Sequence, residues 1–371
     1  MPTTNNDYDL RHMQAALGLA RRALGDVAPN PAVGCVLVRE GRIVGRGWTQ
    51  SGGRPHAEVE ALVRAGEAAK GATAYVSLEP CAHDGKTTPC TKALITAGIV
   101  RAVVAVEDPD PRVAGKGIEQ LGQAGIKVKV GVASQAAADI NAGFFLRVSE
   151  GRPLVTLKTA TTLDGRIATS EGESEWITCE QSRQVSHYFR ATHDAILVGV
   201  GTVSIDNPLL TCRLSGFENR VPVRIVVDSR LRLPLTSKLV ATAGRIPTWV
   251  VAREDVDNER MLAFRDCGVE VLGMPIDENG YPDIGEMMQE FGRRGLTRIL
   301  MEGGGRLTAA LFARELIDRI AWFRAPFIMG GDGIATTAAF GVDRLADMPT
   351  FIRQETRVIG VDQLEIYSRR Q

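Results

Sequence analysis

The chain lacks an excess of charge of either sign. Its 371 residues include 44 lysines and arginines against 44 aspartates and glutamates, so the formal net charge is zero at neutral pH. Strongly basic proteins attract nucleic acid because they release counterions from its phosphate backbone. This balanced composition argues against a polynucleotide substrate and leaves only a local basic patch as a route to one.

Long apolar runs and a leader-like start are also missing. The longest runs, such as 195–200, are far shorter than the ~20 residues that cross a bilayer. The chain starts with Asp7-Tyr8-Asp9-Leu10 and an amphipathic pattern, where a secretory signal would have a basic stretch and an apolar core. We therefore expect a cytoplasmic protein without a membrane partner, whose cysteines are reduced.

Length and composition predict two globular domains. Apolar residues make up 44% and charged residues 24% of the chain, as in ordinary globular proteins. A prior of roughly 150 residues per domain gives two domains for this length. Gly151 and Pro153 interrupt the pattern between a predicted helix, 136–147, and a predicted strand, 154–158. We place the boundary at 149–152, which gives domains 1–148 and 153–371.

The first half alternates helical and strand patterns, which predicts an α/β domain with helices on both faces of a mixed sheet. Helices are expected at 9–24, after 56, from 90, at 116–124 and at 136–147. Strands are expected at 33–38, 41–45, 74–78, 102–106 and 128–130.

Three short segments of this half carry the pattern of a catalytic zinc site. They are His56-Ala57-Glu58, Glu79-Pro80-Cys81 and Cys90. Catalytic zinc takes three imidazole, thiolate or carboxylate ligands and keeps a fourth position open for water. His-x-Glu followed by Pro-Cys-x-x-Cys is the signature of zinc deaminases, in which the glutamate moves protons and does not ligate. We predict His56, Cys81 and Cys90 as metal ligands and Glu58 as the catalytic acid and base.

The expected local structure suits these roles. Cys90 opens a predicted helix, whose dipole favours the thiolate that binds metal. His56 and Glu58 fall in the first turn of another helix. The apolar residues expected to pack that helix on the sheet are Val59, Leu62, Val63 and Ala65.

The spacing of the two cysteines departs from the signature. Eight residues separate Cys81 from Cys90, where the general pattern has two. The alternative interpretation is a surface histidine and two buried cysteines that act as small apolar residues. It requires the His-Ala-Glu, Pro-Cys, strand and helix patterns to coincide by chance.

The second half again alternates strands, near 154, 194, 223, 247, 269, 298 and 319, with helices near 178, 258, 284 and 306. This order predicts a largely parallel sheet with a ligand crevice at its strand ends. Gly303-Gly304-Gly305 precedes a predicted helix and suits either a phosphate cradle or a tight turn with positive φ. Gly199-x-Gly201 is not a Rossmann fingerprint, because Asp206-Asn207-Pro208 interrupts the long helix required.

Longer motifs resemble the bifunctional deaminase-reductase family of bacterial riboflavin biosynthesis over nearly the whole chain. In the first half they are Asn30-Pro31-x-Val33-Gly34 and Pro80-Cys81-x-His83-x-Gly85-Lys86-Thr87-x-Pro89-Cys90. In the second half they include Lys158-Thr159-Ala160, Leu163-Asp164-Gly165-Arg166, Asp206-Asn207-Pro208, Val227-Asp228-Ser229 and Glu302-Gly303-Gly304. The resemblance implies a cytidine-deaminase-like three-layer domain followed by a domain similar in fold to dihydrofolate reductase.

The resemblance also implies Zn²⁺ and NADPH as cofactors and assigns residues to them and to the substrates. The zinc ligands and Glu58 are those predicted above. Cofactor-contact positions are Ala160, Trp176, Thr202, Asp206, Ser229 and Gly304. Substrate-contact positions are Asn30, His83 and Lys86 in the deaminase half, and Ser174, Arg190, Leu210, Arg213 and Glu302 in the reductase half.

Plainer interpretations of these residues stay open. Asn30 before Pro31 is a normal turn residue, and Lys86 suits a solvated loop. Arg190 and Arg213 suit pairing with a substrate phosphate or an ordinary solvated surface, and Trp176 suits core packing. The pair Ser229-Arg230 follows a predicted strand, where it would favour the 2′-phosphate of NADPH over NADH.

The activity implied by the resemblance has two steps. The first is hydrolytic deamination of 2,5-diamino-6-(5-phosphoribosylamino)pyrimidin-4-one, and the second is NADPH-dependent reduction of the ribosyl group to ribityl. The family also implies a homo-oligomer, associated through the reductase domain. One alternative is a nucleoside or tRNA-type zinc deaminase fused to an NADPH-binding reductase of other specificity. Another is a non-catalytic zinc module with a nucleotide-sensing domain.

Overall fold

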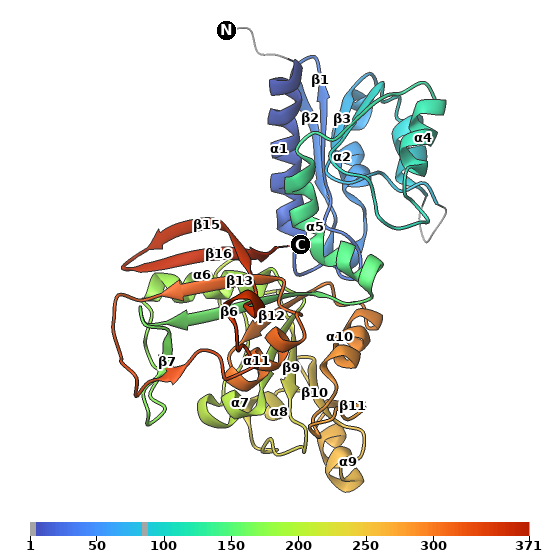
Figure 1. Ribbon diagram of the computed structural model, residues 1–371. Helices are drawn as coiled ribbons and strands as arrows, with labels where there is room; N and C mark the ends of the chain where they lie inside the picture. The colour runs from blue at the N-terminus through green and yellow to red at the C-terminus, as the bar shows by residue number, and fades with distance from the viewer. Residues whose placement is uncertain (1–4, 84–87, 371) are drawn as a thin grey trace. The chain divides into compact units, whose positions relative to one another are not determined.

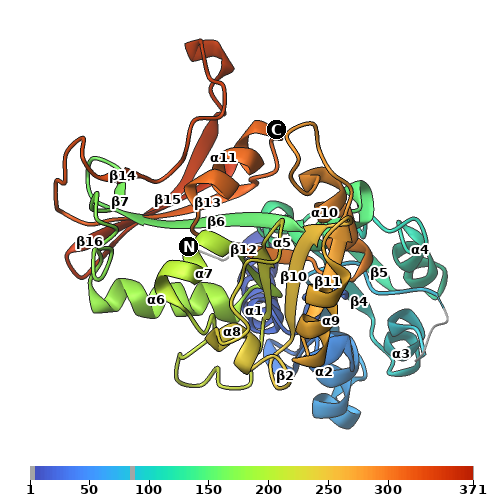
Figure 2. The same ribbon diagram turned by 90° about the horizontal axis from the view of Figure 1, so that it is seen from below.

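The computed structural model describes residues 5–83 and 88–370. The chain divides into two compact units, Met1–Gly151 and Arg152–Gln371. Figures 1 and 2 show the helices and strands of both units.

The N-terminal unit is built on a mixed five-stranded sheet with the order β2-β1-β3-β4-β5. Its strands are β1 (Gly34–Arg39), β2 (Arg42–Trp48), β3 (Thr73–Val76), β4 (Arg101–Val104) and β5 (Lys127–Val130). β1 runs antiparallel to β2 and β3, whereas β3, β4 and β5 are parallel. Glu40 and Gly41 join β1 to β2 with positive φ at both positions, 49° and 77°, as a two-residue hairpin requires.

Helices cover both faces of this sheet and complete the three layers that the sequence predicted. They are α1 (Asn5–Ala23), α2 (Ala57–Ala65), α3 (Cys90–Thr96), α4 (Lys116–Gln123) and α5 (Ser134–Glu150). Side chains alternate along β1, so that Cys35 and Leu37 pack with α2, α3 and α4. Val36 and Val38 pack with α1 and α5 on the opposite face. The α/β sandwich is therefore confirmed.

The face that α2 turns to the sheet differs from the prediction. Ala57, Glu58 and Ala61 are buried, whereas Val63 is 74% exposed. A Cβ at Gly47 of β2 would lie 2.1 Å from the carbonyl oxygen of Ala57, and a Cβ at Gly45 would crowd Ala61 similarly. The helix lies so close to β2 that only small residues fit between them. Of the predicted residues, Leu62 and Ala65 do pack against the core, whereas the prediction for Val63 is wrong because the close approach to β2 favours Ala57 and Ala61 at the buried positions.

The C-terminal unit contains a nine-stranded sheet with the order β11-β10-β9-β8-β12-β6-β13-β16-β15. Its seven parallel strands are β6 (Leu154–Thr161), β8 (Ala195–Gly199), β9 (Val223–Val227), β10 (Thr248–Arg253), β11 (Glu270–Met274), β12 (Arg298–Glu302) and β13 (Arg319–Arg324). The predicted parallel sheet is confirmed.

An antiparallel hairpin at one edge of this sheet was missed. β15 (Phe351–Ile359) pairs with β16 (Asp362–Arg369), and β16 pairs with β13 (Figure 1). Seven successive residues of β15 are exposed, so the strand lacks the apolar alternation by which a half-buried strand is recognised. A small separate sheet joins β7 (Arg166–Ala168) to β14 (Ile334–Ala335).

Helices cover the two faces of the nine-stranded sheet. They are α6 (Glu180–Ala191), α7 (Val200–Asp206), α8 (Lys238–Ala241), α9 (Asn258–Asp266), α10 (Ile284–Arg293) and α11 (Gly305–Ala313). α10 and α11 pack on one core and α7, α8 and α9 on another. α7 ends at Asp206, and Asn207 takes a left-handed conformation before Pro208. The exclusion of a Rossmann fingerprint is confirmed, because no long helix follows Gly201. Across 5–83 and 88–370, none of the helices combines the length and apolarity that membrane crossing needs.

A buried carboxylate ties α1 to three strands. Asp9, 1% exposed, accepts hydrogen bonds from the Tyr75 hydroxyl at 3.0 Å and the Lys129 ammonium at 2.9 Å. The Arg101 guanidinium donates two more, at 2.8 and 2.7 Å. These bonds, with Arg101 contributing most, hold the pKa of Asp9 well below its usual range. The ionised carboxylate is therefore part of the fold.

Replacing Asp9 by Asn should lower the free energy of unfolding of this unit by about 2 kcal/mol at pH 7, because the half-buried Arg101 and Lys129 lose the countercharge of the buried carboxylate. A depressed folded-state pKa stabilises above the unfolded-state pKa of about 3.9 and loses that effect as pH falls. Urea unfolding should therefore show the difference between wild type and Asp9→Asn shrinking from pH 5 to pH 3. A difference that stays constant would contradict this account, and the exposed Glu67→Gln serves as control.

Candidate active sites

Three segments of the N-terminal unit bring the predicted zinc ligands together. His56 is the N-cap of α2, Cys81 follows β3 and Cys90 is the first residue of α3. The His56 Nδ1 atom lies 3.3 Å from the Cys90 Sγ atom and 3.6 Å from the Cys81 Sγ atom. All three ligand atoms lie within 4.8 Å of one another.

These distances fit a tetrahedral zinc ion. Zn–S and Zn–N bonds of about 2.3 and 2.0 Å place nitrogen and sulfur ligands about 3.6 Å apart. The backbone N–H of Cys90, at the start of α3, donates to the Cys81 Sγ atom at 3.3 Å. Hydrogen bonds from Cys90 and His56 lower the pKa of the Cys81 thiol to about 4, so the thiolate that zinc requires is favoured.

Glu58 is the acidic group inside this cluster. It lies in the first turn of α2, is 3% exposed, and contacts the Cys90 thiol. Burial, and next the charge of Cys81, raises the pKa of Glu58 to about 7. A carboxyl group with such a pKa both accepts and releases a proton near neutral pH.

Glu79 organises the loop beside the cysteines. Its buried carboxylate accepts backbone N–H bonds from Asp108 (3.2 Å), Gly115 (3.0 Å), Gly117 (2.8 Å) and Ile118 (3.2 Å). These bonds fix the start of α4 against the strand end that carries Cys81. The sequence offered Glu79 only as part of a motif and gave no sign of this bonding.

Of the predicted substrate contacts in this half, the structure places two. The Asn30 side chain packs on Gly53, where an added Cβ would lie 1.9 Å from the Asn30 Nδ2 atom. Gly53 is three residues before His56, so Asn30 borders the segment that carries the metal ligand. His83 is exposed, two residues after Cys81, and Lys86 lies outside the described residues.

Asp108 is a residue that sequence reasoning missed. It follows β4, which pairs in parallel with β3, so it lies at the same sheet edge as Cys81. Burial raises the pKa of Asp108 to about 6. The signal in the sequence was an acidic residue directly after a buried strand.

Two adjoining cavities lie in the C-terminal unit, at the carboxyl ends of β8, β9 and β12. The larger, about 880 Å³, is lined by four predicted cofactor residues: Thr202, Asp206, Ser229 and Gly304. The smaller, about 480 Å³, is lined by all five predicted substrate residues: Ser174, Arg190, Leu210, Arg213 and Glu302. Ser174, Thr202 and Asp206 line both cavities.

Ala160 and Trp176 line the smaller cavity, although both were predicted as cofactor contacts. Trp176 is 65% exposed and the Arg183 guanidinium lies 4.4 Å from its ring centroid. Core packing, the alternative interpretation of Trp176, is therefore wrong.

The tight turn with positive φ predicted for the glycine loop is confirmed, and the phosphate cradle stays a prediction with which the position of the loop agrees. Gly303 and Gly304 have φ values of 86° and 94°, which side chains rarely adopt. α11 begins at Gly305, and the loop lines the larger cavity, as a phosphate cradle at a helix N-terminus would.

The arginine near Ser229 differs from the predicted one. Arg232 lines the larger cavity, and Arg230 is not among its lining residues. Asp228 explains the choice, because its carboxylate accepts a hydrogen bond from the Leu233 N–H at 2.7 Å and lies 3.8 Å from Arg232. The turn so formed directs the second arginine after Ser229 toward the cavity.

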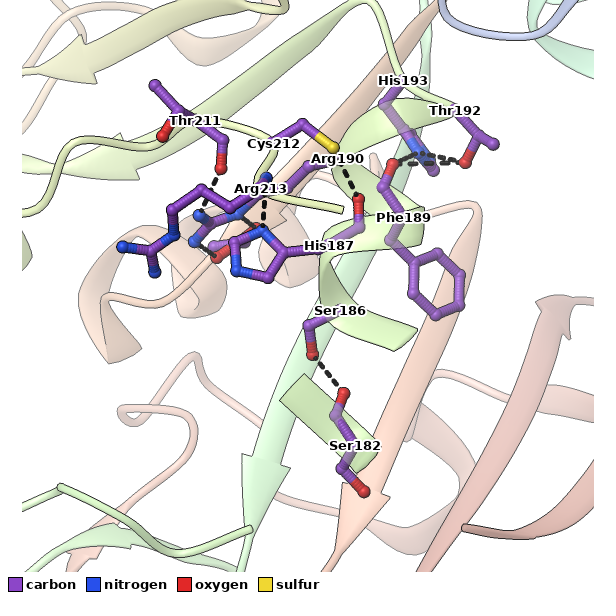
Figure 3. A network of polar contacts seen from close by, with 11 residues as sticks. Ser182, Ser186, His187, Phe189, Arg190, Thr192, His193, Thr211, Cys212 and Arg213 are labelled. Atoms are coloured by element: carbon purple, nitrogen blue, oxygen red, sulfur yellow. Dashed lines mark hydrogen bonds and ion pairs between the residues drawn. The ribbon is translucent and has the colours of Figure 1, made fainter. Parts of the chain in front are cut away.

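A buried ion pair between Arg190 and Glu302 lines the smaller cavity. The Arg190 guanidinium donates to both carboxylate oxygens of Glu302, at 2.6 and 2.7 Å. It also donates to the Thr211 carbonyl at 3.0 Å (Figure 3). Burial alone would raise the pKa of Glu302, but Arg190 and then Lys158 hold it below its usual range. The Arg190 guanidinium is thus paired with the Glu302 carboxylate, whereas the Arg213 side chain is exposed and lines the cavity.

Lys158 is a further cavity residue to which the sequence assigned no role. It lies on β6 and lines the smaller cavity, where burial lowers the pKa of its ammonium group. The cavity thereby gathers Lys158, Arg183, Arg190 and Arg213, a set of cations suited to an anionic ligand.

A zinc-deaminase-type site on one unit and a two-cavity site on the other define a protein with two catalytic domains. Family models agree with this class. The model "Cytidine and deoxycytidylate deaminase zinc-binding region" matches residues 6–106, and the model "RibD C-terminal domain" matches residues 153–360.

Relatives cover almost the entire chain. The riboflavin biosynthesis protein RibD of Aquifex aeolicus is 41% identical over 98% of this chain and 99% of its own length. That of Escherichia coli is 40% identical over 95% and 97%. A solved structure of Acinetobacter baumannii RibD matches 99% of this chain and 100% of its own, with 36% identity and a TM-score of 0.88. The chain belongs to the riboflavin biosynthesis protein RibD family.

A second solved structure carries the names of two activities. It is a diaminohydroxyphosphoribosylaminopyrimidine deaminase and 5-amino-6-(5-phosphoribosylamino)uracil reductase from Thermotoga maritima, 31% identical to this chain. It covers 99% of this chain and 100% of its own, with a TM-score of 0.85.

Proposed function

We propose that this protein catalyses two consecutive steps of riboflavin biosynthesis. The N-terminal domain removes an amino group from 2,5-diamino-6-(5-phosphoribosylamino)pyrimidin-4-one by hydrolysis. The C-terminal domain then reduces the ribosyl group of the product to ribityl with NADPH. The observation that carries the proposal is the convergence of His56, Cys81, Cys90 and Glu58 at one site in a chain that matches RibD relatives over both domains.

In the deaminase site each residue has a distinct task. His56, Cys81 and Cys90 would hold Zn²⁺, which would supply Lewis-acid activation of a water nucleophile. Glu58 would accept the proton that the attacking water loses and return it to the leaving amino group, so that one water is consumed and one ammonia released. Glu79 keeps the Cys81 loop in place through its four N–H bonds.

Asn30, His83 and Lys86 complete the deaminase site in this proposal. Asn30 orients the pyrimidine next to His56, consistent with its packing on Gly53. His83 and Lys86 contact the ribose phosphate.

The two cavities of the C-terminal unit suit a reductase. NADPH supplies the hydride, and the protein orients it. The larger cavity would hold the cofactor, with phosphate against the Gly303–Gly305 loop and the start of α11. Ala160 and Trp176 contact its nicotinamide end, where the cavities adjoin. The substrate occupies the smaller cavity, where Arg213 pairs with the substrate phosphate. Ser174 and Leu210 contact other parts of the substrate.

The charges of the smaller cavity support this placement. Arg190 keeps Glu302 ionised, so that the Glu302 carboxylate accepts hydrogen bonds from substrate hydroxyl or amino groups without protonation. Lys158, Arg183 and Arg213 offset the phosphate charge.

The partners we propose are small phosphoribosylaminopyrimidines and no nucleic acid, in keeping with the zero net charge. The cytoplasm is the location we propose, because its reducing conditions keep the ligand thiols of Cys81 and Cys90 available. A tRNA-type or nucleoside deaminase with an unrelated reductase is the rival. Release of ammonia from cytidine as fast as from the pyrimidine phosphate would favour it.

A homo-oligomer formed through the C-terminal unit is also proposed. β15 ends the nine-stranded sheet, and Ile352 and Val358 on it are 50% and 81% exposed. A long exposed edge strand is a template for pairing with another chain. Light scattering after size-exclusion chromatography should give a molar mass that is a multiple of 40.0 kDa. The variant Val358→Lys should have a lower molar mass in the same measurement. A wild-type monomer at micromolar concentration would contradict the proposal.

Replacing Glu58 by Gln should abolish deamination while zinc stays bound, because the amide keeps the shape but moves no proton. Loss of general acid–base catalysis lowers the rate of deamination by roughly 10²- to 10⁴-fold. Ammonia release and zinc content by atomic absorption are the measurements.

The same variant separates the domains. NADPH oxidation with the deaminated intermediate should match that of wild type, since Glu58 lies in the other unit. Retention of deamination by Glu58→Gln would exclude its catalytic role. A wild-type protein that binds zinc but deaminates none of the pathway intermediates would favour the non-catalytic zinc module.

Replacing Arg232 by Ala should raise the KM for NADPH roughly tenfold and leave the KM for NADH nearly unchanged, because the lost charge-assisted bonds reach only the 2′-phosphate. Arg230→Ala is the matched control, an exposed arginine two residues away that does not line the cavity. A larger effect of Arg230→Ala than of Arg232→Ala would restore the interpretation made from the sequence.

A further inference from the structure

The segment 207–213 borders the smaller cavity in an unfavourable backbone conformation. Asn207 and Leu210 have φ values of 39° and 50°, in the left-handed region that non-glycine residues seldom occupy. Leu210, Thr211 and Arg213 line the cavity. Such backbone persists only where surrounding contacts determine it, so the contacts of this segment decide where Arg213 lies.

Helix α6 contacts three successive residues of the segment (Figure 3). Arg190 donates to the Thr211 carbonyl at 3.0 Å, and the Cys212 thiol donates to the His187 carbonyl at 3.4 Å. The backbone N–H of Arg213 donates to the His187 Nδ1 atom at 3.3 Å. The last bond is made by the residue whose side chain faces the substrate cavity.

This bond requires a neutral imidazole with a defined tautomer. A backbone N–H can only donate, so the Nδ1 atom of His187 must carry a lone pair and the proton must be on Nε2. Protonation of Nδ1 would place two donors against each other. Among the three contacts with α6, this is the one that protonation of an imidazole removes as the pH falls below neutral.

The charges around His187 favour its neutral form. Arg190 faces it from α6 and Arg213 from the segment, together with the Cys212 thiol, while Glu302 of β12 is the opposing carboxylate. Burial, and next the two arginines, lowers the pKa of His187, and Glu302 together with the Thr211 backbone carbonyl only partly offsets them. At neutral pH the acceptor is therefore present.

We infer that His187 is a positioning residue for the reductase reaction: its neutral imidazole accepts the bond that holds the Arg213 backbone so that the Arg213 side chain meets the substrate phosphate, and its protonation breaks that bond. This inference rests on the proposed function. His187 does not line the cavity and acts through Arg213.

Steady-state NADPH oxidation by the full-length enzyme, with the deaminated phosphoribosyl intermediate as substrate, tests the inference. His187→Phe keeps a ring but lacks the acceptor, and should raise the substrate KM about fivefold to tenfold, as expected for one lost hydrogen bond. The NADPH KM, the deaminase rate and kcat should stay near wild type. His187→Asn supplies an amide oxygen as acceptor and should restore the substrate KM to within about twofold at pH 8.

The pH profile separates positioning from a purely structural role. The substrate phosphate itself titrates near pH 6 in every variant, so the informative quantity is the ratio of wild-type KM to His187→Asn KM. This ratio should rise about fivefold between pH 8 and pH 5.5, because only the wild type loses its acceptor on protonation. Gln184→Ala, on an exposed position of α6, is the control and should behave as wild type.

Three results would overturn the inference. They are an unchanged KM in His187→Phe, a KM ratio that is flat across this pH range, and an NADPH KM that rises as much as the substrate KM. If His187→Phe does not fold, judged by circular dichroism and thermal unfolding, the ratio for His187→Asn decides alone. A wild-type enzyme that never oxidises NADPH with this intermediate contradicts the proposed function itself, a result distinct from active variants that ignore residue 187.

Discussion

Parallel pairing between neighbouring strands brings separate parts of the sequence to one sheet edge in each unit. In the N-terminal unit β3 and β4 run in register, so the segments that follow them carry Cys81 and Asp108 to the same edge. In the C-terminal unit β8 lies between β9 and β12, so Gly199, Ser229 and Glu302 converge. Parallel strands require long crossover connections, and the helices in these connections supply Glu58, Cys90 and Arg190.

Close backbone approach refines the metal site. α2 lies on Gly45 and Gly47 of β2, where any side chain would collide with its carbonyl groups. The first turn of α2 is therefore buried in the N-terminal unit, and Glu58 lies buried beside the cysteines. Burial raises the pKa of this carboxyl group to about 7, which is the property that lets it carry a proton in both directions. The packing of small residues and the chemistry of Glu58 thus have one cause.

Buried charges hold the loops that parallel sheets leave irregular. Glu79 gathers four backbone N–H groups next to Cys81, and Arg190 joins Glu302 to the Thr211 carbonyl. A buried charge is costly unless it is fully hydrogen-bonded, so each of these groups fixes several partners at once. The left-handed backbone at Leu210 is tolerated in such surroundings.

The sequence by itself determined the α/β class, the seven parallel strands and the zinc cluster, because apolar periodicity and closely spaced ligand motifs are local properties. Through the family resemblance it also named eleven of the residues that line the two cavities. Only the tertiary structure decided which face of α2 is buried, which arginine near Ser229 reaches the cavity, and that Arg190 is paired with Glu302. It also decided that β15 is a strand despite its exposed side chains. These outcomes depend on contacts between residues far apart in the chain, where backbone approach and charge pairing outweigh the local pattern.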